Sequence, residues 1–219
     1  MKVRNKLLIL YFGILFVFMV SSVYATSFQN GDFSSGFTGW SGEIVDINFT
    51  STTVDPASSD YFNIVSPNNQ AQISLDDTYW NNTLYQDFDM DSIESGWKMQ
   101  ISFWIKWAPT DSTYDGLSAT LSDQNGLDAV DLLLEVSNSA LLSGTTVTVD
   151  ITSFAQNHGG EQVELAFTLY DLDYDTSDLL NVDNITFTKI PATPVPVPSS
   201  MLLLFTGLVS LGIGKKMQE

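Results

Sequence analysis

The sequence predicts an all-β protein, an antiparallel β-sandwich of the jelly-roll type. Residues 97–107 alternate strictly between the two faces of a strand. Clusters of Gly, Asn, Asp, Ser and Pro separate short apolar runs at intervals of about a dozen residues. No long stretch has the periodicity of an amphipathic helix. Many short strands joined by turns are typical of sandwiches and barrels.

The run 97–107 is the strongest strand prediction, because every second residue is large and apolar. The side chains expected on its core face are Trp97, Met99, Ile101, Phe103, Ile105 and Trp107. Residues 146–151 and 163–170 repeat this period, whereas 181–188 breaks it at Asp183. The shorter candidate strands are 42–49, 60–65, 70–75, 82–88, 117–122 and 129–136. Within the last of these, residues 132–136 are predicted as buried strand, with a helical turn as the alternative.

The composition excludes several classes of function. The chain of 219 residues has 8 Lys+Arg against 26 Asp+Glu, no cysteine and one histidine. Thiol catalysis, disulfides and cysteine-based metal centres are therefore excluded. The net charge of −18 argues against nucleic-acid binding. A Ser-His-Asp triad could use only His158, which the two following glycines place in a turn.

Residues 1–25 predict a secretory signal peptide. Basic residues open the chain, an apolar run follows as far as Val20, and small residues lead to a cleavage site after Ala25. The alternative is an N-terminal membrane anchor, but the apolar run is shorter than the about 20 residues that span a bilayer. The folded body would then occupy residues 26–190.

The C-terminus predicts a second targeting segment. Residues 191–198 form a proline-rich linker, which would be extended and semi-rigid. Residues 199–214 are uncharged and mostly apolar, and the two lysines that follow would keep this end in the cytoplasm. Because the apolar stretch is short for a permanent transmembrane helix, residues 199–219 are interpreted as a sorting signal that is processed.

These C-terminal residues resemble the PEP-CTERM sorting signal of bacterial exported proteins. The matching positions are Val195, Pro196, Val197, Pro198, Ser199, Ser200 and, after the apolar run, Lys215 and Lys216. Val197 stands where the family usually has Glu, and lysine replaces the commoner arginine. The resemblance implies a Gram-negative bacterium, export by the general secretory route and a transient inner-membrane anchor. It also implies processing by the membrane enzyme exosortase, and delivery to the cell envelope or to the exopolysaccharide matrix of a biofilm.

The predicted body is strongly acidic. It holds every acidic residue except Glu219, and its only bases are Lys98, Lys106 and Lys189. Such a charge keeps a protein soluble at the cost of self-repulsion. Divalent cations would relieve that repulsion.

Both ends of the body resemble the galactose-binding-like jelly roll, a fold shared by many carbohydrate-binding modules. The resemblance rests on residues 30–40 at the start and on segments of 150–190 at the end. It implies a structural calcium ion held by Asp32 near the first strand and Asp183 in the last. Ser34 stands where the family often has Glu. The alternative roles are a turn cap for Asp32 and acceptance of backbone hydrogen bonds by Asp183.

A second acidic cluster lies between two predicted strands. Asp171, Asp173 and Asp175 have the spacing of the first three ligands of a calcium loop. Thr176 replaces the required glycine and Val182 the closing glutamate, so the segment is not an EF-hand. A solvated hairpin loop is favoured over a weak cation site.

Three aromatic side chains could form a platform on which sugar rings stack. Trp104 falls on the strand face opposite Phe103 and Ile105, and Tyr79 and Trp80 are placed in a predicted loop. The alternative for each of them is packing at the core or its rim.

The favoured interpretation is a non-catalytic, exported cell-surface or matrix protein associated with exopolysaccharide. The competing interpretation is a calcium-stabilised, lectin-like carbohydrate-binding module. A glycoside hydrolase, the third class, needs two carboxylates separated by about 5–5.5 or 6.5–9.5 Å. No motif selects such a pair among the many acids of this chain.

Overall fold

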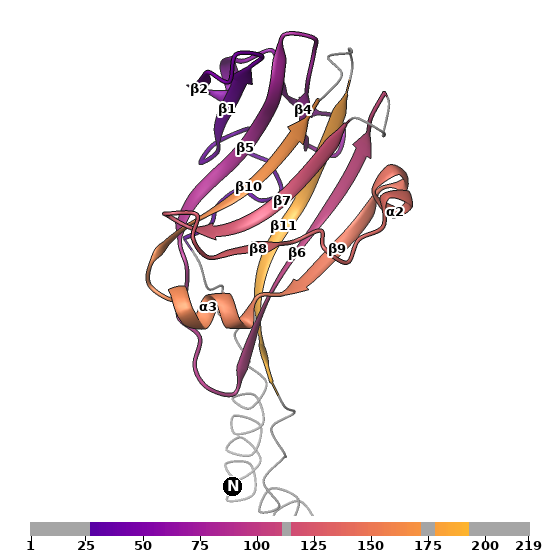
Figure 1. Cartoon of the computed structure of the whole chain (residues 1–219). Coiled ribbons are helices and arrows are strands. Elements are labelled where there is room, and N and C mark those ends of the chain that lie inside the picture. Colours follow the sequence, from indigo (N-terminus) through magenta and orange to yellow (C-terminus); the bar gives the residue numbers. More distant parts are fainter. Residues whose placement is uncertain (1–26, 111–114, 172–177, 193–219) are drawn as a thin grey trace, which may run out of the picture.

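The computed structural model describes residues 27–110, 115–171 and 178–192, which form two antiparallel sheets packed face to face (Figure 1). The six-stranded sheet has the order β2 (Ser51–Val54), β1 (Ser41–Asp46), β5 (Tyr79–Asp89), β10 (Gln162–Tyr170), β7 (Gly116–Asp123) and β8 (Ala129–Asp131). The five-stranded sheet has the order β3 (Phe62–Val65), β4 (Gln70–Ser74), β11 (Leu179–Pro191), β6 (Trp97–Ala108) and β9 (Thr145–Asp150). The predicted all-β antiparallel sandwich is confirmed, and its two layers are consistent with a jelly roll.

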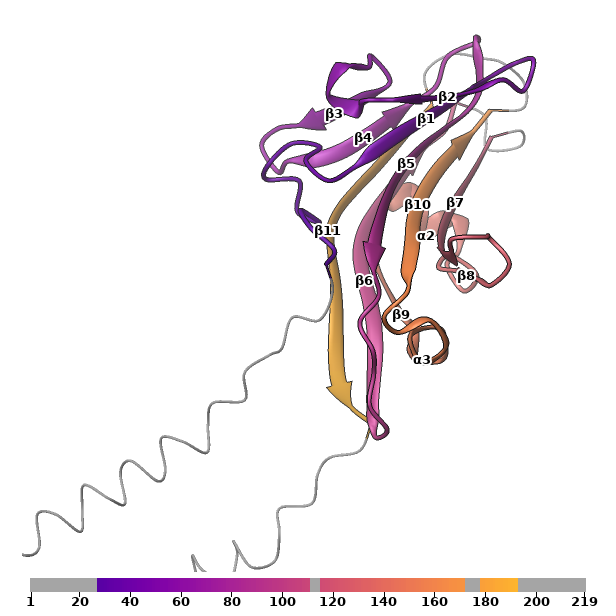
Figure 2. The same cartoon turned by 90° about the vertical axis from the view of Figure 1, so that its left-hand side faces the viewer.

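Short helical segments complete the fold. The 3-10 turn η1 (Pro56–Ser58) joins β2 to β3, whereas α2 (Asn138–Ser143) and α3 (Thr152–His158) precede and follow β9. Both α-helices contact β6. Figure 2 shows β11 and β6, which pair over most of their length, running side by side through the sandwich.

The core lies between the sheets, where the alternating side chains of β6 meet those of β10. Five of the six predicted core residues of β6 are buried, from Met99 to Trp107. Phe103 packs edge to face against Phe167 of β10, with 5.3 Å between the ring centroids. The prediction is wrong for Trp97, which is 40% exposed at the start of the strand.

Each shorter strand prediction overlaps an observed strand, but 129–136 is wrong beyond Asp131. The Asp131 carboxylate accepts the Leu133 N–H at 2.8 Å, and Val136 donates to the Leu133 carbonyl at the same distance. A side chain that satisfies the backbone locally in this way ends strand pairing. Leu134 is consequently exposed rather than buried.

His158 ends α3 instead of lying in a turn. Its Nε2 lies 2.9 Å from an Asp128 carboxylate oxygen and its Nδ1 2.9 Å from one of Glu161. These hydrogen bonds raise the pKa of His158, with the bond to Asp128 contributing most. The histidine therefore connects α3 to the β7–β8 hairpin.

The segment before β1 docks against the last strand. Ile185 donates its N–H to the Gly31 carbonyl at 2.9 Å, and a Cβ on Gly31 would overlap the Ile185 carbonyl oxygen, so the approach needs glycine. Asn184, at φ 55°, lies in a register shift of β11, at the point where the alternation of the sequence breaks. Phe33 and Trp40 of this segment are buried. The two segments that carry the jelly-roll resemblance thus lie side by side.

The targeting predictions fall outside the described residues. These are the signal peptide 1–25 with Ala25, and residues 193–219 with Val195–Ser200, Lys215 and Lys216. Pro191, predicted to open the linker, is the last residue of β11. Within the described ranges no helix has the length and apolar character needed to cross a membrane.

Candidate functional site

A groove with a volume of about 700 Å³ lies on the outer face of the six-stranded sheet. Strand alternation builds it, because the neighbouring positions of β5 and β10 point inward and fill the core. Its floor comes from four adjacent strands, β1, β5, β10 and β7. The floor residues are Glu43, Thr83, Tyr85, Asp87, Ser118, Thr120, Ser122, Glu164, Ala166, Thr168 and Tyr170.

Strand register arranges these side chains in rows that cross the sheet. In the central row Ala166 lies between Tyr85 and Thr120, its direct partners on β5 and β7. The small alanine leaves the middle of the floor low. In the next row Thr168 pairs with Thr83, and their hydroxyl oxygens are 2.9 Å apart. The middle of the groove is therefore low and lined by hydroxyl groups.

One side of the groove is acidic. Glu164 lies directly opposite Asp87 on β5 and Ser122 on β7. Burial raises the pKa of Glu164, and the charges of Asp87 and Glu43 raise it further. These carboxylates can accept hydrogen bonds from several hydroxyl groups of one ligand.

The other side ends in a cluster of aromatic rings, here called the aromatic edge, that contains the exposed Phe49 and the half-buried Trp80 and Tyr170. The Trp80 ring packs edge to face against Tyr170 at 5.6 Å and against Phe49 at 5.4 Å. Phe49 is 68% exposed. The Tyr170 hydroxyl lies 3.3 Å from the Ser118 Oγ on the groove floor, so the aromatic edge continues into the groove.

The β7–β8 hairpin, residues 123–126, forms a wall at one end of the groove. The Asp123 carboxylate accepts the N–H groups of Leu127 at 2.7 Å and Asp128 at 3.1 Å. These backbone hydrogen bonds lower the pKa of Asp123. The wall is therefore held by its own hydrogen bonds without a ligand.

The three aromatic residues predicted as a sugar platform are not brought together. Tyr79 and Trp80 lie on β5 rather than in a loop. Only Trp80 belongs to the aromatic edge, because Tyr79 packs against the core with its ring 4.9 Å from that of Tyr61. Trp104 lies on the five-stranded sheet, on the opposite side of the sandwich.

The structure brings Asp32 and Asp183, the predicted calcium ligands, to one hollow of about 410 Å³ beside Trp104. Burial raises the pKa of Asp183, and the charge of Asp32 adds to this. The alternative roles are also visible. Asp32 accepts the Ser34 N–H at 3.2 Å, and Asp183 accepts the Asn184 N–H at 2.7 Å.

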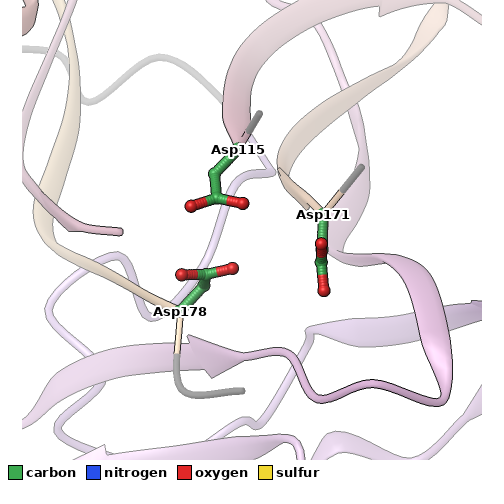
Figure 3. Close-up of side chains that lie close together, drawn as sticks. All are labelled: Asp115, Asp171 and Asp178. Carbon is green, nitrogen blue, oxygen red and sulfur yellow. The ribbon is translucent and has the colours of Figure 1, made fainter. Parts of the chain in front are cut away.

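A cluster that the sequence did not predict contains Asp115, Asp171 and Asp178 (Figure 3). All three side chains are buried, so the expectation of a solvated loop is wrong for Asp171. Asp173 and Asp175 lie outside the described residues. The signal in the sequence is weak, an acid next to the end of each of three strands, because only the topology places those ends together.

Comparisons with solved structures find similarity over about three quarters of the chain. A tailspike protein of bacteriophage CBA120 is 16% identical with a TM-score of 0.46, covering 76% of this chain and 22% of that chain. The module TmCBM61, solved in complex with β-1,4-galactotriose, is 14% identical with a TM-score of 0.43, covering 76% and 98%.

The Stig cyclase Fisc from Fischerella sp. TAU is 17% identical with a TM-score of 0.46, covering 77% of this chain and 98% of that chain. No family model and no curated protein matches the chain. Similarity at these values does not assign a function, so the functional argument rests on the groove.

Proposed function

We propose that this protein binds a carbohydrate chain, without catalysis, in the groove of the six-stranded sheet. The observation that carries the proposal is the composition of that surface: rows of hydroxyl and carboxylate groups that end in the aromatic edge. Sugars present hydroxyl groups around their rims and apolar faces on their rings. They match a site that combines polar groups with exposed aromatic rings.

The charges in the groove restrict the class of glycan. Glu43, Asp87 and Glu164 give it a negative side, and none of its lining residues is basic. Uronic acids and sulfated sugars would be repelled by this surface. A neutral or amino-sugar polysaccharide is the ligand class that fits.

The groove also supports binding in preference to hydrolysis. It is a broad surface on exposed strand faces, and the carboxylates on its acidic side lie on the floor of one sheet. An enzyme would need an acid and a second carboxylate on opposite sides of the scissile bond. Release of reducing ends from a bound glycan would contradict the non-catalytic proposal.

A glycan array probed with the full-length protein tests the binding. Tyr85→Ala removes an aromatic ring from the groove, whereas Trp104→Ala removes one from the opposite sheet. The proposal predicts selective binding that Tyr85→Ala weakens about tenfold or more and that Trp104→Ala leaves unchanged. Loss with Trp104→Ala alone would move the site to the five-stranded sheet, and no binding by the folded protein would refute the proposal.

The location of the protein is a second proposal, supported by the terminal residues alone. We propose export through the signal peptide, followed by exosortase processing at the sorting signal and retention in the envelope or matrix. Mass spectrometry of the protein recovered from its native cells tests both steps. A start at Thr26 and loss of the residues after the proline-rich linker are expected, and an intact terminus at either end would refute the corresponding step.

A further inference from the structure

Three buried aspartates meet at one end of the sandwich. Asp115 immediately precedes β7, Asp171 immediately follows β10, and Asp178 immediately precedes β11. They lie at the same end because Gly116 pairs with Tyr170 in one sheet and β11 begins beside the end of β6 in the other. One carboxylate oxygen from each falls within 4.8 Å of the others.

Burial makes this cluster costly. Asp115 is 8% exposed, and Asp171 and Asp178 are fully buried. Carboxylate groups this close in a buried site repel one another unless positive charge lies beside them. The body offers few such charges, because Lys98 pairs with Asp150, Lys189 pairs with Asp91, and Lys106 is exposed on β6.

A second observation points to a ligand. Asp178 accepts the Thr110 N–H through Oδ1 at 2.7 Å, but within the described residues its buried Oδ2 accepts no hydrogen bond. Figure 3 shows the Asp178 carboxylate facing that of Asp115, with Asp171 beside both. A buried acceptor without a donor costs stability unless another group, such as an ion, satisfies it.

A second buried oxygen that accepts no hydrogen bond among the described residues lies near this cluster, on Asn82. Asn82 donates through Nδ2 to the Ser74 carbonyl at 2.6 Å, while its buried Oδ1 has no hydrogen-bond partner among the described residues. Ser74 is followed by Leu75, whose N–H donates to the Asp178 carbonyl at 3.2 Å. The same end of the sandwich therefore holds a further unused oxygen acceptor.

We propose that Asp115, Asp171 and Asp178 bind one calcium ion. Oxygen ligands alone, with no sulfur or imidazole, favour a hard cation over zinc. Calcium binds oxygens at about 2.3–2.6 Å, so two of its ligands can lie up to about 5 Å apart, whereas magnesium at about 2.0–2.1 Å allows only about 4.2 Å. Three oxygens within 4.8 Å of one another can all reach one calcium ion, and the flexible coordination of calcium suits ligands from three separate strand ends better than the strict octahedron of magnesium.

The ion would join the two sheets, because Asp115 and Asp171 flank strands of one sheet and Asp178 flanks a strand of the other. It would also hold one end of the glycan groove. Asp171 follows Tyr170 of the aromatic edge, and its N–H donates to the Trp80 carbonyl at 3.0 Å. The site is distinct from the predicted pair Asp32 and Asp183 and does not depend on the groove binding a glycan.

Calcium titration of chelator-treated full-length protein tests the site, with isothermal calorimetry and thermal unfolding as the two readouts. The wild type should bind calcium and gain at least 5 °C in Tm. Asp178→Asn should lose one bound ion per chain or at least tenfold in affinity. The matched control Asp89→Asn, an exposed acid of β5 outside both hollows, should keep this ion, and magnesium should raise Tm much less than calcium.

The unfolding temperature of Asp178→Asn in the absence of calcium gives a second test, because a purely structural role of Asp178 would predict a change in the opposite direction. Asp178→Asn removes one of three crowded carboxylates, so in chelator it should unfold at a higher temperature than the wild type, and calcium should reverse that order. If Asp178→Asn fails to fold, native mass spectrometry of the wild type and Asp115→Asn provides the test. The wild type should retain one calcium ion, and Asp115→Asn should lose it. No calcium-dependent shift in the wild type, or unchanged calcium binding by both variants, would overturn the proposal.

Discussion

Replacing Glu164 with glutamine should stabilise the protein and weaken its glycan binding at the same time. Glu164 lies in the groove directly opposite Asp87, and its pKa is raised by burial, by Asp87 and by Glu43. The substitution keeps the shape of the side chain, removes its charge and replaces one acceptor oxygen with an NH₂ donor. The two effects of that charge can therefore be measured separately.

The stability gain follows from the cross-strand pair. Like charges directly opposite on neighbouring strands cost about 0.2–1 kcal/mol, and the partial burial of Glu164 adds to this cost, so we expect a gain of about 1 kcal/mol at pH 7. Because the pKa of Glu164 is higher in the folded state, wild-type stability falls as the pH rises from 4.5 through that raised pKa. Glu164→Gln lacks this fall, so its advantage grows over the same pH range and then levels off.

The loss of binding follows from the hydrogen bond that a charged acceptor makes. Such bonds contribute about 1.5–3 kcal/mol, which corresponds to a loss of about 10- to 100-fold in affinity. Urea unfolding between pH 4 and 8 measures the first effect, and calorimetry with the glycan selected on the array measures the second.

Asp89→Asn is the matched control, because Asp89 also points outward from β5 but lies opposite Gln162 and outside the groove. It should change neither quantity by more than about 0.5 kcal/mol. A Glu164→Gln protein that is less stable than the wild type at pH 7, or that binds the glycan equally well, would refute the assignment of Glu164 as a charged groove residue.

Two further predictions concern the scaffold. His158→Gln should remove about 0.3–1 kcal/mol of stability, and because the pKa of His158 is raised in the fold, this loss is full below pH 6.5 and disappears as the pH rises through the raised pKa. Urea unfolding at pH 5.5 and 8.5 measures it, and an equal loss at both values would show that the ion pairs contribute nothing. Gly31→Ala should cost about 2–4 kcal/mol, because its Cβ would overlap the backbone of β11 and disturb the docked segment. Gly36→Ala is its comparison, since a Cβ there meets open space and only the φ of 64° is unfavourable, for about 1–2 kcal/mol. Thermal unfolding of the two variants should show a clear gap, and equal Tm values would contradict the steric argument.

The strand pattern was predictable from sequence because alternation is a local property. The alternation of residues 97–107 predicted β6, and the alternation of residues 181–188 breaks at Asp183, where the structure shows a register shift in β11. Local side-chain hydrogen bonds explain the failure at 129–136, where the Asp131 carboxylate turns the chain. The hydropathy pattern of the sequence does not reveal such a hydrogen bond.

The candidate sites depend on contacts between segments that are distant in the sequence, so the sequence predicted only some of their residues. Asp32 and Asp183 were paired through a resemblance, and they do line one hollow. Tyr79 and Trp80 are neighbours in sequence, yet one ring packs against the core and the other lies at the surface. Consecutive residues of a strand point to opposite faces, and the register shift at the start of β5, where Asp46 pairs with Tyr79 while Val45 pairs with Asn81, lies at this point.

The sequence by itself determined the fold class, the boundaries of most strands, the acidic character of the body and the segments interpreted as targeting signals. Each of these depends on periodicity or composition, which a single chain displays along its length. Only the tertiary structure decided the groove and the cluster of Asp115, Asp171 and Asp178. Cross-strand register builds the groove. The antiparallel pairing of β7 with β10, and the start of β11 at the same end of the other sheet, bring together aspartates that lie far apart in the chain.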